Sequence, residues 1–235
     1  MVIAIIALLL SIITPALRGA KEQARKTVRA AHVKSLLTVI YVYAAKNNDN
    51  IPAGYPGNNA TWNFICWQAF EEPACWINLG HLYGTDVIDD PEIFYCPSQK
   101  NKILQNYHST GWDWKSPTGN EERAISYMYG LLAEIRAMPQ LELESTKLVD
   151  LKKRALICDV FEPFEEGPVW AHPKGLTTGF GAGHVEFIKV DKEVIDVAAE
   201  MDESYGRTRN EMDLFVAAMF ELLAGKKQVM EQEFL

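Results

Sequence analysis

The chain is poor in cysteine and carries no excess of positive charge, and both shortages exclude whole classes of protein. Four cysteines in 235 residues are too few for a disulfide scaffold. None of them pairs as Cys-x-x-Cys, which argues against a zinc ribbon or a thioredoxin-like site. The net charge of −8 argues against nucleic acid as the main partner, because phosphate binding needs concentrated Lys and Arg. At 48% hydrophobic residues, the chain can bury a core.

Charge is also absent from the opening segment, Met1 to Leu17, which reads MVIAIIALLLSIITPAL. As a helix this segment rises ~26 Å, slightly less than a hydrocarbon core of ~30 Å. No basic residue precedes it, which disfavours a cleavable secretory signal. Apolar residues on every face predict contact with lipid or with other helices, and burial in the protein's own core is the alternative. The predicted membrane and assembly positions are Val2, Ile3, Ile5, Ile6, Leu8, Leu9, Leu10, Ile12, Ile13, Pro15 and Leu17.

A basic, amphipathic segment follows. Six basic residues and a single acid, Glu22, lie between Arg18 and Lys34. Turn-forming residues from Asn47 to Pro52 end the pattern. We predict one helix from about residue 2 to about residue 47, bent at Pro15, where a backbone hydrogen bond is lost. Small and apolar residues trace a stripe along it at Leu17, Ala20, Ala24, Val28, Ala31, Leu36, Ile40 and Tyr43.

Two domains follow from this pattern: a transmembrane and assembly helix over 1–48, and a globular head over 49–235. Residues 49–120 are rich in Asn, Gly, Pro and Trp, and they predict loops and short helices, such as Trp62 to Glu71. A short helix is also predicted from Ser145 through Arg154. Strands are predicted at 124–129, 155–161 and 184–190. A helical stripe from Phe215 to Leu223, stopped by Gly225, predicts a C-terminal helix. The fold class is therefore α+β, a long helix packed on a small antiparallel sheet with loop-rich insertions.

The residue types that carry chemistry are present but are not arranged as a site. The run Gly179-x-Gly181-x-Gly183 leads into a strand, which predicts a hairpin turn and not a phosphate loop. His172 and His184, with Asp159, Cys96 or Cys158, are candidate zinc ligands, but their spacing favours a structural role. A nucleophilic pair of Cys96 with a histidine lacks an orienting third group. The acidic residues Asp191, Glu193 and Asp196 predict a solvated face more than a calcium site.

We therefore predict no catalytic residue, no cofactor and no metal ion, and hence no enzyme. In an exported head, a disulfide joining Cys66 to Cys75 is possible from their sequence separation. A bridge from Cys96 to Cys158 is an equally permitted alternative.

The stretch VIAIIALLLSIITPALRGAKEQARKTV resembles the N-terminal helix of type IV pilin-like proteins and type II secretion pseudopilins. In that family a basic leader, a Gly and Phe-Thr-Leu-Ile-Glu-Leu-Leu come before this stretch, so Met1 is expected to lie inside the family's helix. Further likenesses point to the prepilin-type branch with a C-terminal His-x9-Asp-Gly motif, in which Ala182 replaces the Asp. They lie in the segments Phe94–Ser98 and Ile125–Gly130, and the motif residues are Cys96, Pro97, His172, Gly183 and His184. A cysteine of that branch is replaced by Arg29, which excludes a bridge from there to Cys96.

The resemblance implies a structural subunit, held in the bacterial inner membrane by a single pass with a periplasmic head. It would assemble into a type II secretion pseudopilus or a type IV pilus-like fibre. Its expected partners are other pilin-like subunits, the membrane and the assembly machinery, and not nucleic acid. The alternatives are a membrane-tethered periplasmic metal-binding or hydrolytic domain, and a surface adhesin that uses the Trp-bearing region from 55 to 115.

Overall fold

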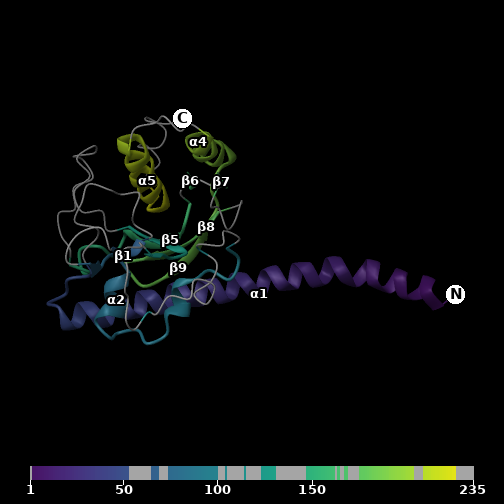
Figure 1. The fold of residues 1–235 in the computed structure, drawn as a ribbon, viewed down its shortest axis with the longest axis horizontal. Helices are drawn as coiled ribbons and strands as arrows, with labels where there is room; N and C mark the ends of the chain where they lie inside the picture. The colour runs from purple at the N-terminus through teal and green to yellow at the C-terminus, as the bar shows by residue number, and fades with distance from the viewer. Residues whose placement is uncertain are drawn as a thin grey trace.

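The computed structural model describes residues 2–52, 65–68, 74–99, 104, 114, 123–130, 147–161, 163–164, 167–168, 175–203 and 209–225. Helix α1 (Val2–Lys46) is the longest element, and its 45 residues span about 68 Å. Its N-terminal part projects from the packed head and curves gently toward the N-terminus (Figure 1). The predicted long helix is confirmed, and it ends one residue before the predicted end.

The end of α1 follows from its turn-forming residues. Asn48 and Asp49 adopt left-handed backbone conformations, with φ of 54° and 67°. Asn and Asp tolerate this conformation better than most residues, because their short side chains bond to nearby backbone. The Asn47 side-chain amide donates a hydrogen bond to the Tyr43 carbonyl at 2.8 Å, and this bond satisfies a carbonyl of the last turn.

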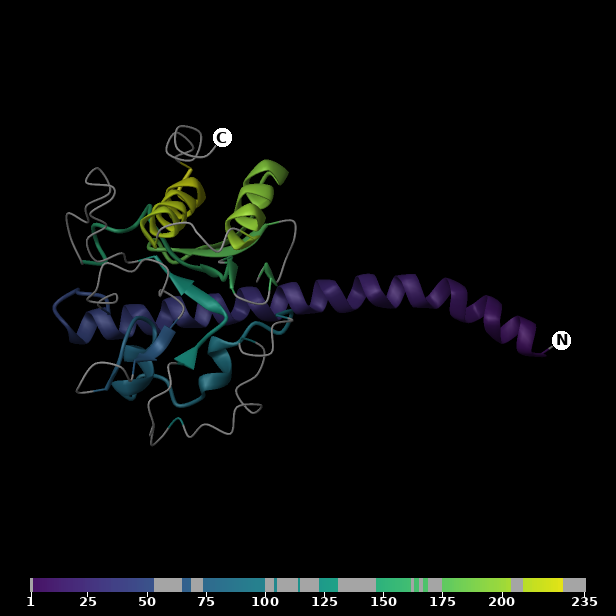
Figure 2. The same cartoon turned by 45° about the horizontal axis from the view of Figure 1, so that its top comes forward.

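The main sheet has four antiparallel strands in the order β4-β5-β8-β9. Helix α1 lies along one face of this sheet, and α4 and α5 lie on the other side (Figures 1 and 2). The strands are β4 (Tyr127–Tyr129), β5 (Ala155–Asp159), β8 (Leu176–Phe180) and β9 (Val185–Ile188), and the helices are α4 (Lys192–Glu203) and α5 (Arg209–Leu223). The α+β class, the antiparallel sheet and the C-terminal helix are therefore as predicted.

A second, smaller sheet lies beside the main one, with strand order β2-β1-β3. It pairs β1 (Ile65–Gln68) with β2 (Cys75–Trp76) and with β3 (Arg123–Ala124). Short helical segments follow at α2 (Gly80–Gly84) and η2 (Pro91–Phe94). A two-stranded pair joins β6 (Pro163–Phe164) to β7 (Gly167–Pro168).

Three local predictions were wrong. The predicted helix from Trp62 to Glu71 contains strand β1, because Trp67 pairs with Trp76 across the small sheet. The predicted strand over 124–129 is interrupted at Ser126, whose backbone N–H donates to Phe94 and whose hydroxyl donates to Leu104. Residues 148–153 form turns where a short helix was expected. Helix α4 was not predicted.

Strand β8 was also missed, because its glycines were interpreted only as turn residues. Gly179 lies inside this strand, where α1 approaches most closely. A Cβ atom at Gly179 would lie 2.7 Å from Cγ1 of Val33 and 2.9 Å from Cδ1 of Leu37. Glycine inside a strand commonly marks such a close approach of another element. The turn that follows, Gly181 to Gly183, is the predicted hairpin turn into β9.

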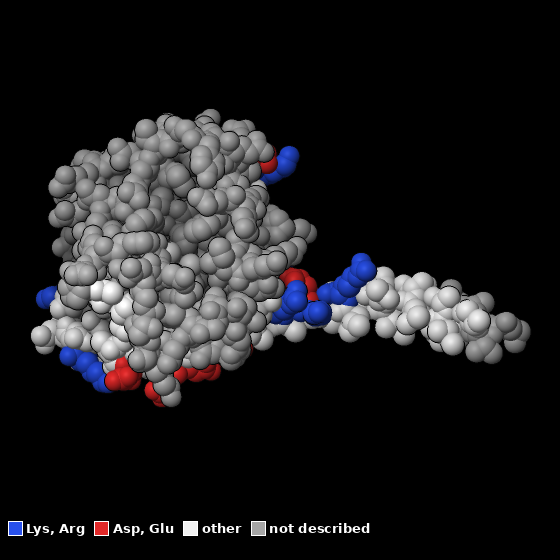
Figure 3. Space-filling view, viewed as in Figure 1, with Lys and Arg blue, Asp and Glu red and all other residues white. Residues whose placement is uncertain are grey.

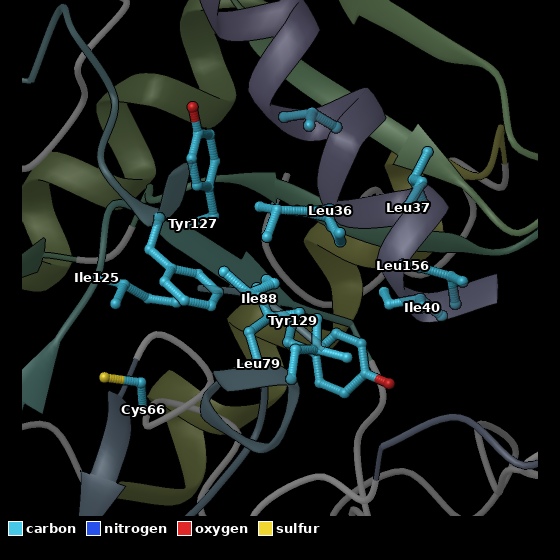
Figure 4. Close-up of a cluster of buried hydrophobic side chains, with 14 of the residues drawn as sticks. Leu36, Leu37, Ile40, Cys66, Leu79, Ile88, Ile125, Tyr127, Tyr129 and Leu156 are labelled. Atoms are coloured by element: carbon cyan, nitrogen blue, oxygen red, sulfur yellow. The ribbon is translucent and has the colours of Figure 1, made fainter. Parts of the chain in front are cut away.

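The head has two hydrophobic clusters, and strands of the main sheet contribute to both. Along β4 the side chains alternate: Met128 belongs to the cluster with α5, whereas Tyr127 and Tyr129 belong to the cluster with α1. This alternation is the expected period-2 pattern of a strand buried on both faces. Figure 4 shows the second cluster, in which Leu36, Leu37 and Ile40 of α1 face the sheet and the loop residues beyond it.

Candidate assembly surface

The apolar opening of α1 is exposed. From Ile3 to Val28, no described side chain of the helix is buried. Figure 3 shows the helix before Arg18 as a rod without charged residues, which projects beyond the basic residues near the head. On α1, the described large apolar side chains that are at least half exposed are Ile3, Ile6, Leu9, Leu10, Ile12, Ile13 and Leu17. An apolar surface of this continuity marks a contact site, because soluble monomers rarely leave so many large side chains in water.

No helix among the described residues is both long and apolar enough to cross a bilayer. All of the predicted membrane and assembly positions lie on the projecting part of α1, and Pro15 lies inside the helix. The side chains of Val2, Ile5 and Leu8 lie outside the described set.

The face of α1 that packs into the head begins at Arg29. The predicted stripe was right at Leu36 and Ile40, which are fully buried. It was wrong further toward the N-terminus, since Val28 is 44% exposed and the stripe residues before it, Leu17, Ala20 and Ala24, are exposed. The buried positions of α1 follow steps of about three and four residues, at Arg29, Val33, Leu36, Leu37, Ile40 and Ala44.

Arg29 forms a buried ion pair between α1 and the sheet. Its Nε atom lies 3.8 Å from Oδ2 of Asp159 on β5, and both side chains are 1% exposed. The backbone N–H of Thr177 donates a hydrogen bond to the same carboxylate oxygen at 2.7 Å. The guanidinium also lies 5.8 Å from the ring centroid of Phe187 on β9, within cation–π range. Arg29 therefore ties α1 electrostatically to two strands of the main sheet, β5 and β9, and its partner Asp159 is in turn bonded to β8.

Burial governs the protonation of the groups around this pair. It raises the pKa of Asp159 to about 6, against the lowering effects of Arg29 and the Thr177 hydrogen bonds. Burial, followed by the charge of Asp159, raises the pKa of Cys96 to about 12. A thiol with this pKa is protonated near neutral pH and is a poor nucleophile. The surroundings of Cys96 therefore do not support a role as a nucleophile paired with a histidine base.

The sequence marks Arg29 as one of the basic residues of the amphipathic segment and as the residue at the position of a family cysteine. In the structure its charge slightly opposes the rise in the pKa of Cys96. A signal for its burial was present, because Arg29, Val33, Leu36 and Ile40 follow one another at helical spacing. Because arginine side chains are mostly exposed in proteins, this spacing alone does not predict that Arg29 is buried.

The hairpin turn between β8 and β9 is fastened to α1. The Tyr41 hydroxyl donates to the Gly181 carbonyl, and the Lys34 ammonium donates to the Gly183 carbonyl. Gly183 has a φ of 85°, a left-handed conformation that favours glycine. This turn therefore gives the predicted motif residue Gly183 a structural role.

The remaining motif residues do not converge on one site. His184 stacks on Phe180 with ring centroids 4.5 Å apart, and its Nε2 lies 3.6 Å from Oε1 of Glu186. Cys96 is buried and Pro97 is exposed in the loop after η2. The predicted motif residue His172 lies outside the described residues.

The proposed disulfides are not formed: all four cysteines, each of them described, are present as thiols. The correction for Cys66 and Cys75 follows from the strand register. Cys75 lies opposite Gln68, and the Ile77 N–H bonds to the Cys66 carbonyl, so the two cysteines are offset by two residues. The alternative bridge is also absent, because Cys158 belongs to the cluster with α5 and Cys96 to the cluster with α1.

Within the described part of the chain, no three His, Cys, Asp or Glu side chains lie close enough together to hold a metal ion. Asp191, Glu193 and Asp196 are exposed around the start of α4, and Asp196 pairs with Lys192 at 3.7 Å. These acids form a solvated face, which is the arrangement that the sequence favoured.

Comparison with family models, curated proteins and solved structures finds no match to this chain.

Proposed function

We propose that this protein is a pilin-like structural subunit, anchored in the bacterial inner membrane by the start of α1 and assembled through that helix into a pseudopilus or pilus-like fibre. The observation that carries the proposal is the row of exposed Ile and Leu side chains on a helix that leaves the head. Such side chains are stabilised by contact with lipid or with apolar helices of neighbouring subunits. The likeness of this segment to the pilin family supports the same role.

The charge distribution fits parallel assembly. Arg18, Lys21, Arg25 and Lys26 follow the apolar segment directly, whereas the chain as a whole is acidic. In a fibre of parallel subunits, these basic residues would lie opposite the acidic head of a neighbour. Opposite charges of this kind set register and orientation more than affinity.

The direct test is substitution within the full chain. Replacing Leu9 and Ile13 together by Asp places two charges on the exposed apolar face, where they oppose burial in lipid or in a helix bundle. We expect the double variant to lose membrane association and crosslinking between subunits in cells. Membrane fractionation and crosslinking measure the two effects.

The matched control is Val42→Asp, because Val42 is also exposed, at 42%, but lies on the part of α1 that belongs to the head. This control is expected to retain both properties. If the Leu9/Ile13 variant associates and crosslinks like the unaltered chain, the apolar segment is not the assembly element.

The proposed orientation, with the head on the periplasmic side of the inner membrane, has a separate test. Of the four cysteines, Cys75 is the exposed one. A periplasmic head would place this thiol within reach of a membrane-impermeant maleimide once the outer membrane is permeabilised. The Cys75→Ser variant controls for labelling elsewhere. Labelling only after the inner membrane is lysed would contradict the proposed orientation.

A further inference from the structure

A cavity of about 420 Å³ opens beside α2, on a part of the head that the proposed assembly role does not use. Its described lining combines three aromatic side chains with two carboxylates: Trp76, Tyr83, Trp114, Asp86 and Asp89. Trp76 belongs to β2, Tyr83 belongs to α2, and the two aspartates follow α2 in the chain. Trp114 comes from a more distant segment. Ligand cavities commonly show this mixture of apolar wall and a few placed polar groups.

The aromatic wall is held rigidly. Trp114 is 2% exposed and is stacked between Phe94 and Trp76, with both centroid distances 5.6 Å. Tyr83 packs against the same two indoles, 5.2 Å from Trp76 and 5.0 Å from Trp114. Trp114 is buried, whereas Trp76 and Tyr83 are half-buried, so the accessible part of the aromatic wall belongs to these two residues.

The glycine at the end of α2 belongs to the same arrangement. A Cβ atom at Gly84 would lie 2.2 Å from Cδ1 of Trp76. Only glycine lets the indole of Trp76 lie across the end of α2 beside the cavity. The wall is therefore preorganised before any ligand arrives, which reduces the entropy cost of binding.

The two acidic lining residues lie in the segment that follows α2. This segment is fixed by backbone hydrogen bonds from Asp86 to Tyr83 at 3.0 Å and from Ile88 to Leu82 at 3.1 Å. Asp86 and Asp89 are both exposed. The described residues that line the cavity thus include two carboxylates and no Lys or Arg.

We propose that this cavity binds a small organic ammonium cation, with its alkyl groups against Trp76 and Tyr83 and its charge facing Asp86 and Asp89. Aromatic rings of Trp and Tyr attract cations through their quadrupoles, and carboxylates add direct Coulomb attraction. A neutral sugar would use the same aromatic surface but would gain no Coulomb attraction from the two carboxylates. Charge complementarity therefore favours the cation.

The test uses the full chain in a polyoxyethylene detergent, whose headgroup carries neither charge nor sugar. Choline is the probe, its neutral carbon analogue is the matched ligand, and glucose represents the sugar alternative. Binding is measured by calorimetry and by ligand-observed NMR. We expect choline to bind, the neutral analogue to bind at least about tenfold more weakly, and the affinity for choline to fall with added salt.

The variants separate the cavity from nonspecific charge attraction. Asp86→Asn combined with Asp89→Asn is expected to raise the Kd for choline at least about tenfold, whereas Asp150→Asn, an exposed carboxylate in the turn over 148–153, is expected to leave it unchanged. The unfolding transition of each variant checks that the head is intact. Equal binding of choline and its neutral analogue, binding of glucose alone, absence of choline binding, or unchanged affinity in the double variant would each overturn the proposal.

Discussion

Arg29 and Asp159 bring opposite charges into the interior between α1 and the main sheet, where both side chains are 1% exposed. The Asp159 carboxylate accepts a hydrogen bond from Thr177, but its pKa is still raised to about 6. Desolvation of the charged carboxylate therefore outweighs the attraction of Arg29, as is common for buried ion pairs. The pair positions α1 on the sheet more than it stabilises the fold.

The raised pKa of Asp159 predicts that the free energy of unfolding depends on pH. The pKa of Asp159 rises from 3.8 to about 6 on folding, so the folded state binds the proton more tightly. The stability gained from protonation is complete below the lower value and is lost as pH rises through about 6. At ~1.4 kcal/mol per pKa unit, the loss is about 3 kcal/mol.

The Asp159→Asn variant lacks this titration. We therefore expect the free energy of unfolding of the unaltered protein, relative to the variant, to fall by about 3 kcal/mol between about pH 4 and about pH 7. Denaturant unfolding at closely spaced pH values measures the difference. A difference that does not change with pH would show that Asp159 keeps an ordinary pKa in the folded state.

A second residue-scale prediction concerns Gly179 in β8. Its replacement by Ala puts a Cβ atom 2.7 Å from Cγ1 of Val33, and this overpacking should lower the free energy of unfolding by ~1–3 kcal/mol. Gly19 is the matched control, because it has no atom within 4 Å of the corresponding Cβ position. Gly19→Ala should not destabilise the protein, since Ala is a better helix former. Chemical denaturation compares the two, and equal effects would mean that α1 does not press on β8.

At the scale of elements, α1 performs two tasks with one continuous helix. Its last part, from Arg29, supplies a buried face to the head, and its first part supplies an exposed apolar surface. Helix propensity and periodicity continue through both parts, so the boundary between them is set by what packs against the helix. The packed head thus includes residues 29–46.

A pair of leucine substitutions tests this division. Leu36 is fully buried, and Leu36→Ala should cost ~2–5 kcal/mol of unfolding free energy through lost burial and a cavity. Leu9 is 53% exposed, and Leu9→Ala should leave the stability of the head unchanged. Thermal and denaturant unfolding measure both variants in the same detergent. A large loss for Leu9→Ala would mean that the segment is buried in the molecule's own fold.

The whole molecule is a head with a projecting apolar rod, a shape that exposes hydrophobic surface unless something covers it (Figure 1). In the proposed function, this surface is covered by lipid in the membrane and by neighbouring subunits in the fibre. In either setting the head contributes the outer surface, including the cavity beside α2.

Removal of residues 1–17 tests the independence of the head. No buried position of α1 precedes Arg29 among the described residues, so the deletion removes no core contact. We expect the shortened protein to unfold with an unchanged free energy and to be monomeric without detergent. Analytical ultracentrifugation and denaturant unfolding are the measurements. A head that still self-associates as the full chain does would place the contact surface elsewhere.

The features that the sequence by itself determined are those with a local physical cause. The length of α1, its apolar opening, its end at Lys46, the C-terminal helix and the strand over 155–159 follow from periodicity, turn chemistry and runs of β-forming residues. Each of these signals is contained within a short window of the chain. The secondary structure of these particular elements can therefore be predicted without knowledge of distant neighbours.

Only the tertiary structure decided the features that depend on distant partners. Strand β1 forms because of its pairing with β2 and β3, and β8 contains Gly179 because α1 lies against it. Arg29 is buried because Asp159, more than a hundred residues away in the sequence, lies beside it. The cavity beside α2 likewise joins side chains from separate segments. Local propensity carries no record of these contacts, since their energy exists only after the chain has folded.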